Sequence, residues 1–160
     1  MSSDSPIAFF LTISTYGTWL PGDARGWVER KRGWQLPDPV RVLESQARMT
    51  EDACILSLEQ RTVVEAQLEE NCQHRGWEMH AKNCRSNHMH IVVGADNVSP
   101  KKLRIDLKAW CTRRLKEGDP SRDNWWTERG SIRWVWDEES LDAVIQYVNE
   151  AQNRKHLDSL

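Results

Sequence analysis

Long apolar runs are missing from this chain of 160 residues, and its first residues do not have the pattern expected of a leader. No stretch approaches the roughly twenty apolar residues that cross a bilayer, and the opening Met-Ser-Ser-Asp-Ser-Pro has neither the basic nor the apolar region of a signal peptide. Internal repeats and low-complexity tracts are absent as well. These absences argue against membrane-spanning, secreted and repeat proteins. We expect a cytoplasmic protein with no membrane partner and a single domain over residues 1–160.

Paired cysteines and an excess of basic charge are also lacking. The four cysteines are scattered and form no C-x-x-C pair, which argues against a zinc knuckle or a dithiol redox motif and fits reduced thiols inside a cell. With 22 basic and 24 acidic side chains, the formal net charge is −2. Composition by itself therefore does not point to nucleic acid, and a nucleic-acid binder of this charge would need a local basic surface.

Phenylalanine and tyrosine are scarce, with two of each, whereas tryptophan occurs nine times. Tryptophan can stack on unpaired bases, but its ring is more often largely buried. We therefore expect most of these side chains to pack in the core or at interfaces.

The pattern of apolar residues predicts four strands and three helices. Alternating or continuous apolar and β-branched stretches predict the strands, while a capping box at Ser57–Gln60, the Ser99-Pro100 pair and apolar residues at helical spacing predict the helices. In chain order we expect a strand over 8–15, a helix over 57–76, strands over 77–86 and 88–93, a helix over 99–118, a strand over 131–136 and a helix from about residue 140. In the second strand we expect one face to carry Trp77, Met79 and Ala81 and the other to carry Glu78, His80 and Lys82.

This order of elements predicts the fold class. It is α+β, with a ferredoxin-like (RRM-like) four-stranded antiparallel sheet, two helices on one face and an added C-terminal helix. One face of such a sheet is open, and we expect the functional site there. Residues 17–50 should form a long irregular insertion loop after the first strand, since the stretch 17–39 alone holds four Gly, three Pro and three Trp.

The sharpest chemical signal is the pair His88 and His90. Two residues apart on a strand, they point to the same face, and their imidazoles can converge on one metal ion. Met89 between them points the other way, toward the helices. A His-x-His pair also occurs as a surface coincidence or as two histidines with ordinary hydrogen bonds, so the spacing alone leaves both interpretations open.

Two residues of the last helix are candidates for the same site. Tyr147 lies on the flank of the apolar stripe. It is either a tyrosine with a packed ring and a solvent-exposed hydroxyl, or a nucleophile that attacks a phosphodiester. Gln152 occupies an inward position, one turn beyond Val148, and is either a third, oxygen-donating metal ligand or a residue that caps a frayed helix end.

A basic group on the second predicted helix is the candidate nucleic-acid surface. It consists of Lys101, Lys102, Arg104, Lys108, Arg113 and Arg114. A second cluster in the insertion consists of Arg25, Arg30, Lys31 and Arg32. Phosphate contacts need such groups, but charged outer faces of helices are common in proteins of every function, so this is supporting evidence only.

Three motifs in this order resemble the single-tyrosine HUH transposases of the smallest bacterial insertion sequences, which include the REP-associated tyrosine transposases. They are the stretch from Thr15 to Asp23 with the following Arg25-Gly26, the motif Asn87-His88-Met89-His90, and the late helix that ends Tyr147-Val148-Asn149-Glu150-Ala151-Gln152. The similarity runs from about residue 8 to residue 153.

The resemblance implies a transposase that cleaves and rejoins single-stranded, hairpin-forming DNA through a covalent 5′-phosphotyrosine. It implies Tyr147 as the nucleophile, His88 and His90 as ligands of Mg²⁺ or Mn²⁺, and a homodimer in which the tyrosine helix of one subunit serves the other. In some members an amide ligand stands four residues after the tyrosine. Here that position is Ala151, and Gln152 lies five residues on, about 140° around the helix from Tyr147.

Three other functions fit parts of the same pattern. A domesticated or inactive relative would bind or nick structured single-stranded DNA or RNA without transposition. A non-enzymatic nucleic-acid module would carry exposed aromatic residues on its central strands. A metal-dependent phosphodiesterase that uses water would form no covalent adduct.

Overall fold

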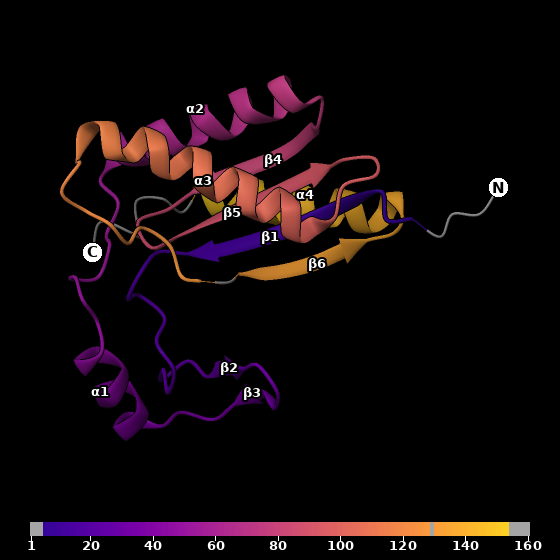
Figure 1. The fold of residues 1–160 in the computed structure, drawn as a ribbon. Coiled ribbons are helices and arrows are strands. Elements are labelled where there is room, and N and C mark those ends of the chain that lie inside the picture. Colours follow the sequence, from indigo (N-terminus) through magenta and orange to yellow (C-terminus); the bar gives the residue numbers. More distant parts are fainter. Residues whose placement is uncertain (1–4, 129, 154–160) are drawn as a thin grey trace.

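The structure is a computed structural model that describes residues 5–128 and 130–153, the side chains of residues 151–153 excepted. At its centre is a four-stranded antiparallel sheet in the order β4-β5-β1-β6 (Figure 1). The strands are β1 (Ala8–Ser14), β4 (Glu78–Cys84), β5 (His88–Gly94) and β6 (Ser131–Val135). The α+β, ferredoxin-like fold class predicted from the sequence is confirmed.

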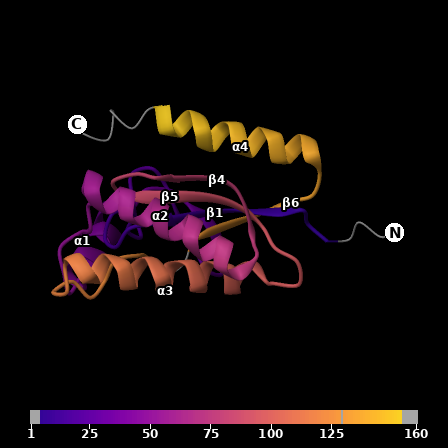
Figure 2. The same ribbon diagram turned by 90° about the horizontal axis from the view of Figure 1, so that it is seen from above.

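Helices cover both faces of this sheet. α2 (Leu58–Arg75) and α3 (Pro100–Gly118) lie on one face, and α4 (Glu138–Asn153) lies across the other, over β4 and β5 (Figure 2). The expectation of an open face was therefore wrong. α4 covers part of it because its apolar stripe, with Leu141 and Val148 buried, needs a surface that excludes water. No helix in the described part of the chain is long and apolar enough to cross a bilayer.

Local sequence determines where the two long helices begin. At the start of α2, the Ser57 side chain accepts a hydrogen bond from Gln60 N, and the Gln60 side chain accepts one from Ser57 N. At the start of α3, Ser99 accepts from Lys102 N. The predicted caps are thus confirmed, and each one satisfies N–H groups that have no partner within the helix.

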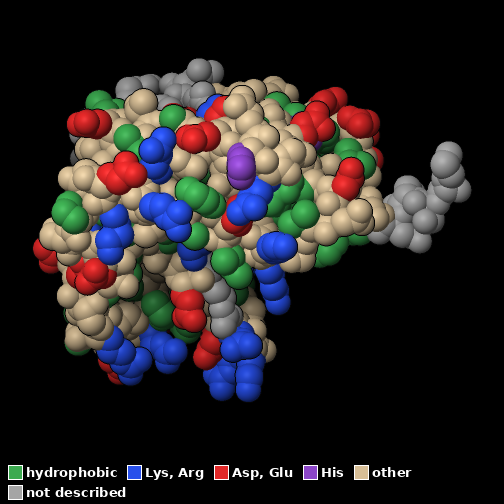
Figure 3. Space-filling model, turned by 45° about the horizontal axis from the view of Figure 1, so that its top comes forward, with side chains coloured by type: hydrophobic (Ala, Val, Ile, Leu, Met, Phe, Trp, Pro, Cys, Tyr) green, Lys and Arg blue, Asp and Glu red, His purple; other side chains and the backbone are tan. Residues whose placement is uncertain are grey.

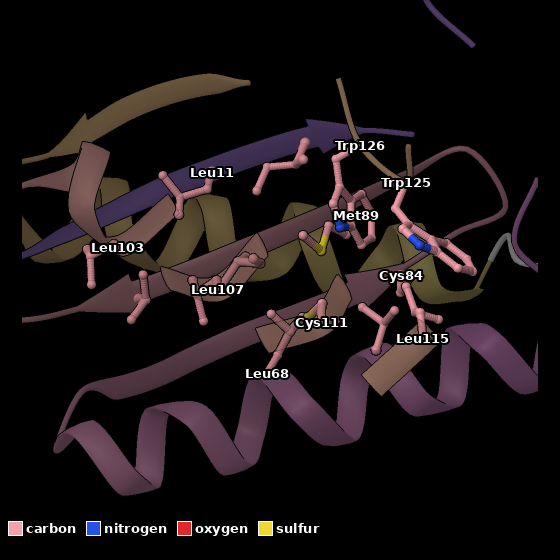
Figure 4. Close-up of a cluster of buried hydrophobic side chains, with 14 of the residues drawn as sticks. Leu11, Leu68, Cys84, Met89, Leu103, Leu107, Cys111, Leu115, Trp125 and Trp126 are labelled. Carbon is pink, nitrogen blue, oxygen red and sulfur yellow. The ribbon is translucent and has the colours of Figure 1, made fainter. Parts of the chain in front are cut away.

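The residues of β1 divide between two apolar clusters. Phe9, Leu11 and Ile13 belong to the larger core between the sheet and helices α2 and α3 (Figure 4), which also holds all four cysteines as buried free thiols. Ala8 and Phe10 face α4 in a smaller cluster. Beyond Phe10 this second face of β1 turns polar, and the candidate site lies at that point.

A β-bulge in β4 changes the faces that the sequence predicts for this strand. The pairing with β5 shifts between Met79 and Ala81. Met79 packs against the larger core, whereas Ala81 packs under α4, so the two do not share a face as predicted. The extra residue of the bulge, His80, reverses the alternation, and Asn83 is thereby turned to the face that α4 covers.

The insertion over residues 17–50 is not an irregular loop, contrary to the expectation. It contains a small hairpin of β2 (Trp27–Glu29) and β3 (Gly33–Gln35), followed by α1 (Pro39–Ala47), and it lies beyond one end of the sheet (Figure 1). The indole N–H groups of Trp19 and Trp27 donate to backbone oxygens within the insertion at 2.8 and 3.0 Å. Such tryptophan–backbone hydrogen bonds help to order this segment. Its many Gly and Pro residues are typical of loops, so the sequence did not predict the short strands and the helix.

Candidate active site

His88 and His90 on β5 lie side by side on the face that α4 covers. Their ring centroids are 4.6 Å apart, and the ring planes make an angle of 73°. His90 is 7% exposed, His88 is partly exposed, and Met89 between them is buried in the larger core. The structure thus brings the two histidines together as their spacing on a strand predicts.

Hydrogen bonds hold both imidazole rings through Nδ1. His88 Nδ1 lies 2.6 Å from Asn87 Oδ1, an acceptor, so this nitrogen carries the proton. His90 Nδ1 lies 2.9 Å from Thr12 Oγ1, and the same tautomer has Nδ1–H donating to the hydroxyl. In this arrangement the lone pair of each ring is on Nε2, the atom that would bind a metal, and the second nitrogen is fixed by a partner, as is usual for metal-binding histidines.

The environment of His90 keeps its ring neutral. Burial, together with the smaller electrostatic effects of His88 and Arg85, lowers the pKa of His90 to about 4. At neutral pH the ring is therefore uncharged, and its Nε2 carries no proton that a cation would have to displace. A neutral imidazole is the form that binds metal.

Tyr147 on α4 lies against this histidine pair. Its ring centroid is 5.8 Å from that of His90 and 6.0 Å from that of Phe10, and the side chain is 55% exposed. One chain therefore brings together the tyrosine of the last helix and the His-x-His motif, which are about sixty residues apart in sequence. Its face toward Phe10 is packed, while the remainder is accessible to a substrate.

The backbone before the histidine motif is held by the start of the insertion. The carbonyl oxygen of Asn87 accepts from Thr15 N at 2.9 Å and from the hydroxyls of Thr15 and Thr18 at 3.2 and 3.3 Å. Thr18 O in turn accepts from Arg25, which pairs with Asp23 at 2.7 Å. The N-terminal motif and the histidine motif thus form one hydrogen-bonded unit.

Sequence reasoning did not identify Thr12, Thr15 or Thr18 as site residues. The available signal was weak: Thr12 is a polar residue on an apolar strand, two positions after Phe10 and on the same face. Thr15 is 0% exposed although it is polar, and burial of this kind is not visible in a sequence.

A divalent cation fits the donors that the site offers. Both histidine side chains lie on the same face of β5, and imidazole is a common ligand of such ions. Within the described residues there is no group of three or more His, Cys, Asp and Glu side chains that could hold a metal. Further ligands would have to be amides, water or substrate oxygens.

Gln152 lies in the last turn of α4, but its side chain falls outside the described part, so its assignment as a ligand stays a prediction.

The basic residues predicted to bind nucleic acid lie on the other side of the sheet, on α3: Lys101, Lys102, Arg104, Lys108, Arg113 and Arg114. Arg104 and Lys108 donate to backbone oxygens of the segment before β6. Arg113 lies over the Trp110 ring, and Arg114 bonds to side chains of α2. On this side of the molecule, basic and acidic side chains are intermixed (Figure 3). Their role in binding DNA stays a prediction, and the structure does not place them beside the histidine pair.

Two other arginines lie nearer the candidate site. Arg133 on β6 is exposed and pairs across the sheet with Phe10, which places it on the face of the histidines. Arg85 follows β4, and its charge acts on His90. Sequence reasoning missed both because neither belongs to a run of basic residues.

Comparison with known proteins decides the family. Residues 49–151, which include both histidines and Tyr147, match the IS200-like transposases. This chain belongs to that family. Among solved structures, this IS200-like transposase is similar to a candidate transposase from Deinococcus radiodurans R1, with 18% identity, a TM-score of 0.49 and coverage of 92% of this chain and 91% of that one. It is also similar to a REP-associated tyrosine transposase bound to a REP hairpin, with 12% identity, a TM-score of 0.49 and coverage of 96% and 72%. No curated protein matches it significantly.

Membership of the family assigns DNA transposition to this protein, an enzymatic reaction that cuts DNA and transfers strands. The matched region of the transposase begins at residue 49. Thr12, Thr15 and Thr18, which hold the histidine motif in place, therefore come from outside the matched region.

Proposed function

We propose that this transposase cleaves and rejoins single-stranded DNA through a covalent 5′-phosphotyrosine at Tyr147, with Mg²⁺ or Mn²⁺ bound by His88 and His90. The observation that carries the proposal is the 5.8 Å between the ring centroids of Tyr147 and His90. A half-exposed phenol beside two paired imidazoles suits phosphoryl transfer, because the nucleophile and the cation would face the same phosphate.

The bond changes follow from this arrangement. The phenol oxygen of Tyr147 attacks the phosphorus, the bond from phosphorus to the 3′ oxygen breaks, and the products are a 5′-phosphotyrosine and a free 3′-hydroxyl. The phenol proton passes to solvent, which the exposed part of the side chain contacts, and the leaving 3′ oxygen takes a proton from solvent. Rejoining is the reverse attack by a 3′-hydroxyl, with Tyr147 as the leaving group. His88 and His90 would hold a cation that could polarise the phosphoryl oxygens and stabilise the leaving oxygen.

Single-stranded, hairpin-forming DNA is the substrate that we propose. His90 is 7% exposed and lies beside Tyr147 of α4, so a phosphodiester can approach it only if the strand departs from the regular path of a duplex. An unpaired segment at the foot of a hairpin can do so. Arg133 is exposed on the same face and would contact its phosphates.

A binding module that stacks bases on its central strands is less consistent with the structure. β1 and β5 are the central strands, and among the described residues their two aromatic side chains, Phe9 and Phe10, are buried. The exposed pair Trp134 and Trp136 stacks at the sheet edge, with centroids 5.8 Å apart. The central strands instead carry the histidines.

The family resemblance implies a homodimer, and we propose that assembly here. Tyr147 already lies beside His90 of its own chain, so the site can be complete within one subunit. In our proposal each α4 therefore serves the site of its own subunit.

The experiment that tests this function uses labelled single-stranded hairpins from the flanks of the gene, incubated with the protein and Mg²⁺ or Mn²⁺ and run on a denaturing gel. We expect a metal-dependent covalent band with the wild type and none with Tyr147→Phe or with the double variant His88→Ala/His90→Ala. Tyr16→Phe is the matched control. Its hydroxyl accepts a hydrogen bond from Thr50 N at 3.0 Å in the insertion, and the band should persist.

Two outcomes would replace the proposal. Cleavage without an adduct that survives Tyr147→Phe would indicate a nuclease that uses water. Binding of several hairpins without cleavage or adduct would indicate a domesticated or inactive relative.

A further inference from the structure

Asn83 on β4 is a buried polar residue without a hydrogen-bond partner. Its side chain is 0% exposed. Within residues 5–128 and 130–153, neither its Oδ1 nor its Nδ2 has a partner. A buried amide that makes no hydrogen bond lowers the stability of the folded state, so such groups are rare and each one needs an explanation.

Other buried amides in the same protein are satisfied. Asn71 on α2 donates to Asp106 at 2.9 Å, and Gln67 accepts from Arg114 at 2.9 Å. Both are almost fully buried, as Asn83 is. The sequence therefore does supply partners to buried amides elsewhere, and Asn83 is an exception at one particular place.

That place is the histidine pair. Asn83 lies directly opposite His90 in the register of β4 and β5, so the two side chains share a face and are neighbours across the strands. On the other side of β5, Thr12 of β1 lies opposite His90, and its hydroxyl is hydrogen-bonded to Nδ1 of His90. His90 thus has two neighbours across the sheet. The hydroxyl of Thr12 is hydrogen-bonded to it, whereas the amide of Asn83 has no hydrogen bond.

The bulge in β4 is what brings Asn83 to this face. Without the shift between Met79 and Ala81, strict alternation would place Asn83 on the same side as Met79, in the larger core. Bulges occur often beside active sites, where they re-aim a side chain. A role for the Asn83 amide beside His90 would therefore explain both the bulge in β4 and the missing hydrogen bonds of the amide.

We propose that Asn83 is part of the cation site. Its Oδ1 supplies an oxygen donor to the ion or to a water bound to it, and its Nδ2 donates to a phosphate oxygen of the substrate. Both amide atoms are then satisfied only when the site is loaded. Oxygen donors suit Mg²⁺ and Mn²⁺, and two imidazoles alone leave most of the coordination positions of these ions unfilled. This inference rests on the function proposed above.

The proposal predicts a separation of stability from metal binding. Asn83→Leu keeps the approximate volume and removes both unpartnered atoms. The apoprotein should therefore have a Tm equal to or above that of the wild type, while the Kd for Mn²⁺ rises about tenfold or more. Asn83→Asp retains an oxygen donor and should bind Mn²⁺ at least as tightly as the wild type.

Asn71→Leu is the matched control. It also replaces a buried asparagine, but one with a partner and on the far side of the sheet. It should lower the Tm and leave the Kd for Mn²⁺ unchanged. Both quantities are measured without DNA, the Tm by thermal unfolding in EDTA and the Kd by Mn²⁺ electron paramagnetic resonance.

The results distinguish this inference from the function on which it rests. Wild-type affinity in Asn83→Leu, with binding lost in His88→Ala/His90→Ala, would overturn the role of Asn83 and leave the histidine site intact. A Tm loss in Asn83→Leu as large as that in Asn71→Leu would also overturn it. Absence of Mn²⁺ binding by the wild type would reject the cation site and the role of Asn83 together.

Discussion

Acid should destabilise this transposase through His90. The pKa of His90 is lowered to about 4, first by burial and then by the charges of His88 and Arg85, from an ordinary value of 6.5 that it regains on unfolding. Below pH 6.5 the unfolded chain therefore binds a proton that the folded chain does not. The stability that the neutral His90 contributes is complete above that pH and is lost as the pH falls toward 4.

The size of the loss follows from the two pKa values. Each pH unit below the unfolded pKa favours the unfolded state by about 1.4 kcal/mol. Between pH 7.5 and pH 5 the folded ring stays neutral, so His90 alone should lower the free energy of unfolding by about 2 kcal/mol. His90→Gln removes this titration and should lose about 2 kcal/mol less than the wild type over the same interval.

Urea denaturation followed by tryptophan fluorescence, in EDTA at both pH values, measures this difference. His74→Gln is the control for replacing a histidine by glutamine, because His74 is exposed near the end of α2, far from the site in sequence. If the wild type and His90→Gln lose the same free energy on acidification, the histidine is not held neutral by burial and the description of the site is wrong.

Three further predictions concern the same site. Thr12→Val removes the partner of His90 Nδ1 at nearly constant volume, so the Kd for Mn²⁺ in calorimetry should rise about 10–100-fold; an unchanged Kd would show that Thr12 does not orient the ring. Mn²⁺ at one hundred times its Kd should raise the free energy of unfolding by about 2.7 kcal/mol in the wild type and not in His88→Ala; an equal rise in both would place the ion elsewhere. A mixture of Tyr147→Phe and His88→Ala/His90→Ala proteins should form no adduct, since each helix serves its own subunit; a restored adduct on the gel would show that the helix serves the partner.

The sequence allowed the histidine pair to be placed because a strand has a simple rule of alternation. His88 and His90 share a face wherever the strand lies, and Met89 must take the other. Helical spacing likewise put Tyr147 on the flank of the stripe that holds Val148, and α4 packs by that stripe. These predictions rest on local geometry, which the sequence contains.

The position of α4 and the role of Asn83 depend on longer-range features. An apolar stripe shows that a helix is buried, but not which surface buries it, and so the sheet face was expected to be open. The bulge in β4 has no signature in the sequence, and alternation carried past Met79 gives the wrong face for Ala81 and Asn83.

The basic residues of α3 show that a charge cluster in the sequence need not lie at the active site. The basic residues of α3 stand out in the sequence because they are close together, but the fold places that helix on the side away from His90. Arg133 is isolated in sequence and lies on the face of the site. The clustering of charges in the sequence therefore identified a charged surface, whereas the sheet register was needed to place Arg133 on the face of the site.

The most direct test of the account is to identify the residue that carries the DNA. The adduct formed with a hairpin and Mn²⁺ would be trimmed by nuclease, digested with trypsin and analysed by mass spectrometry. Because the chain has two tyrosines, Tyr16 and Tyr147, which lie far apart in the sequence, the peptides distinguish them. We predict a nucleotide phosphate on the peptide that contains Tyr147, and only in reactions with metal. A modified Tyr16 peptide, or cleaved DNA with no modified tyrosine, would contradict the mechanism.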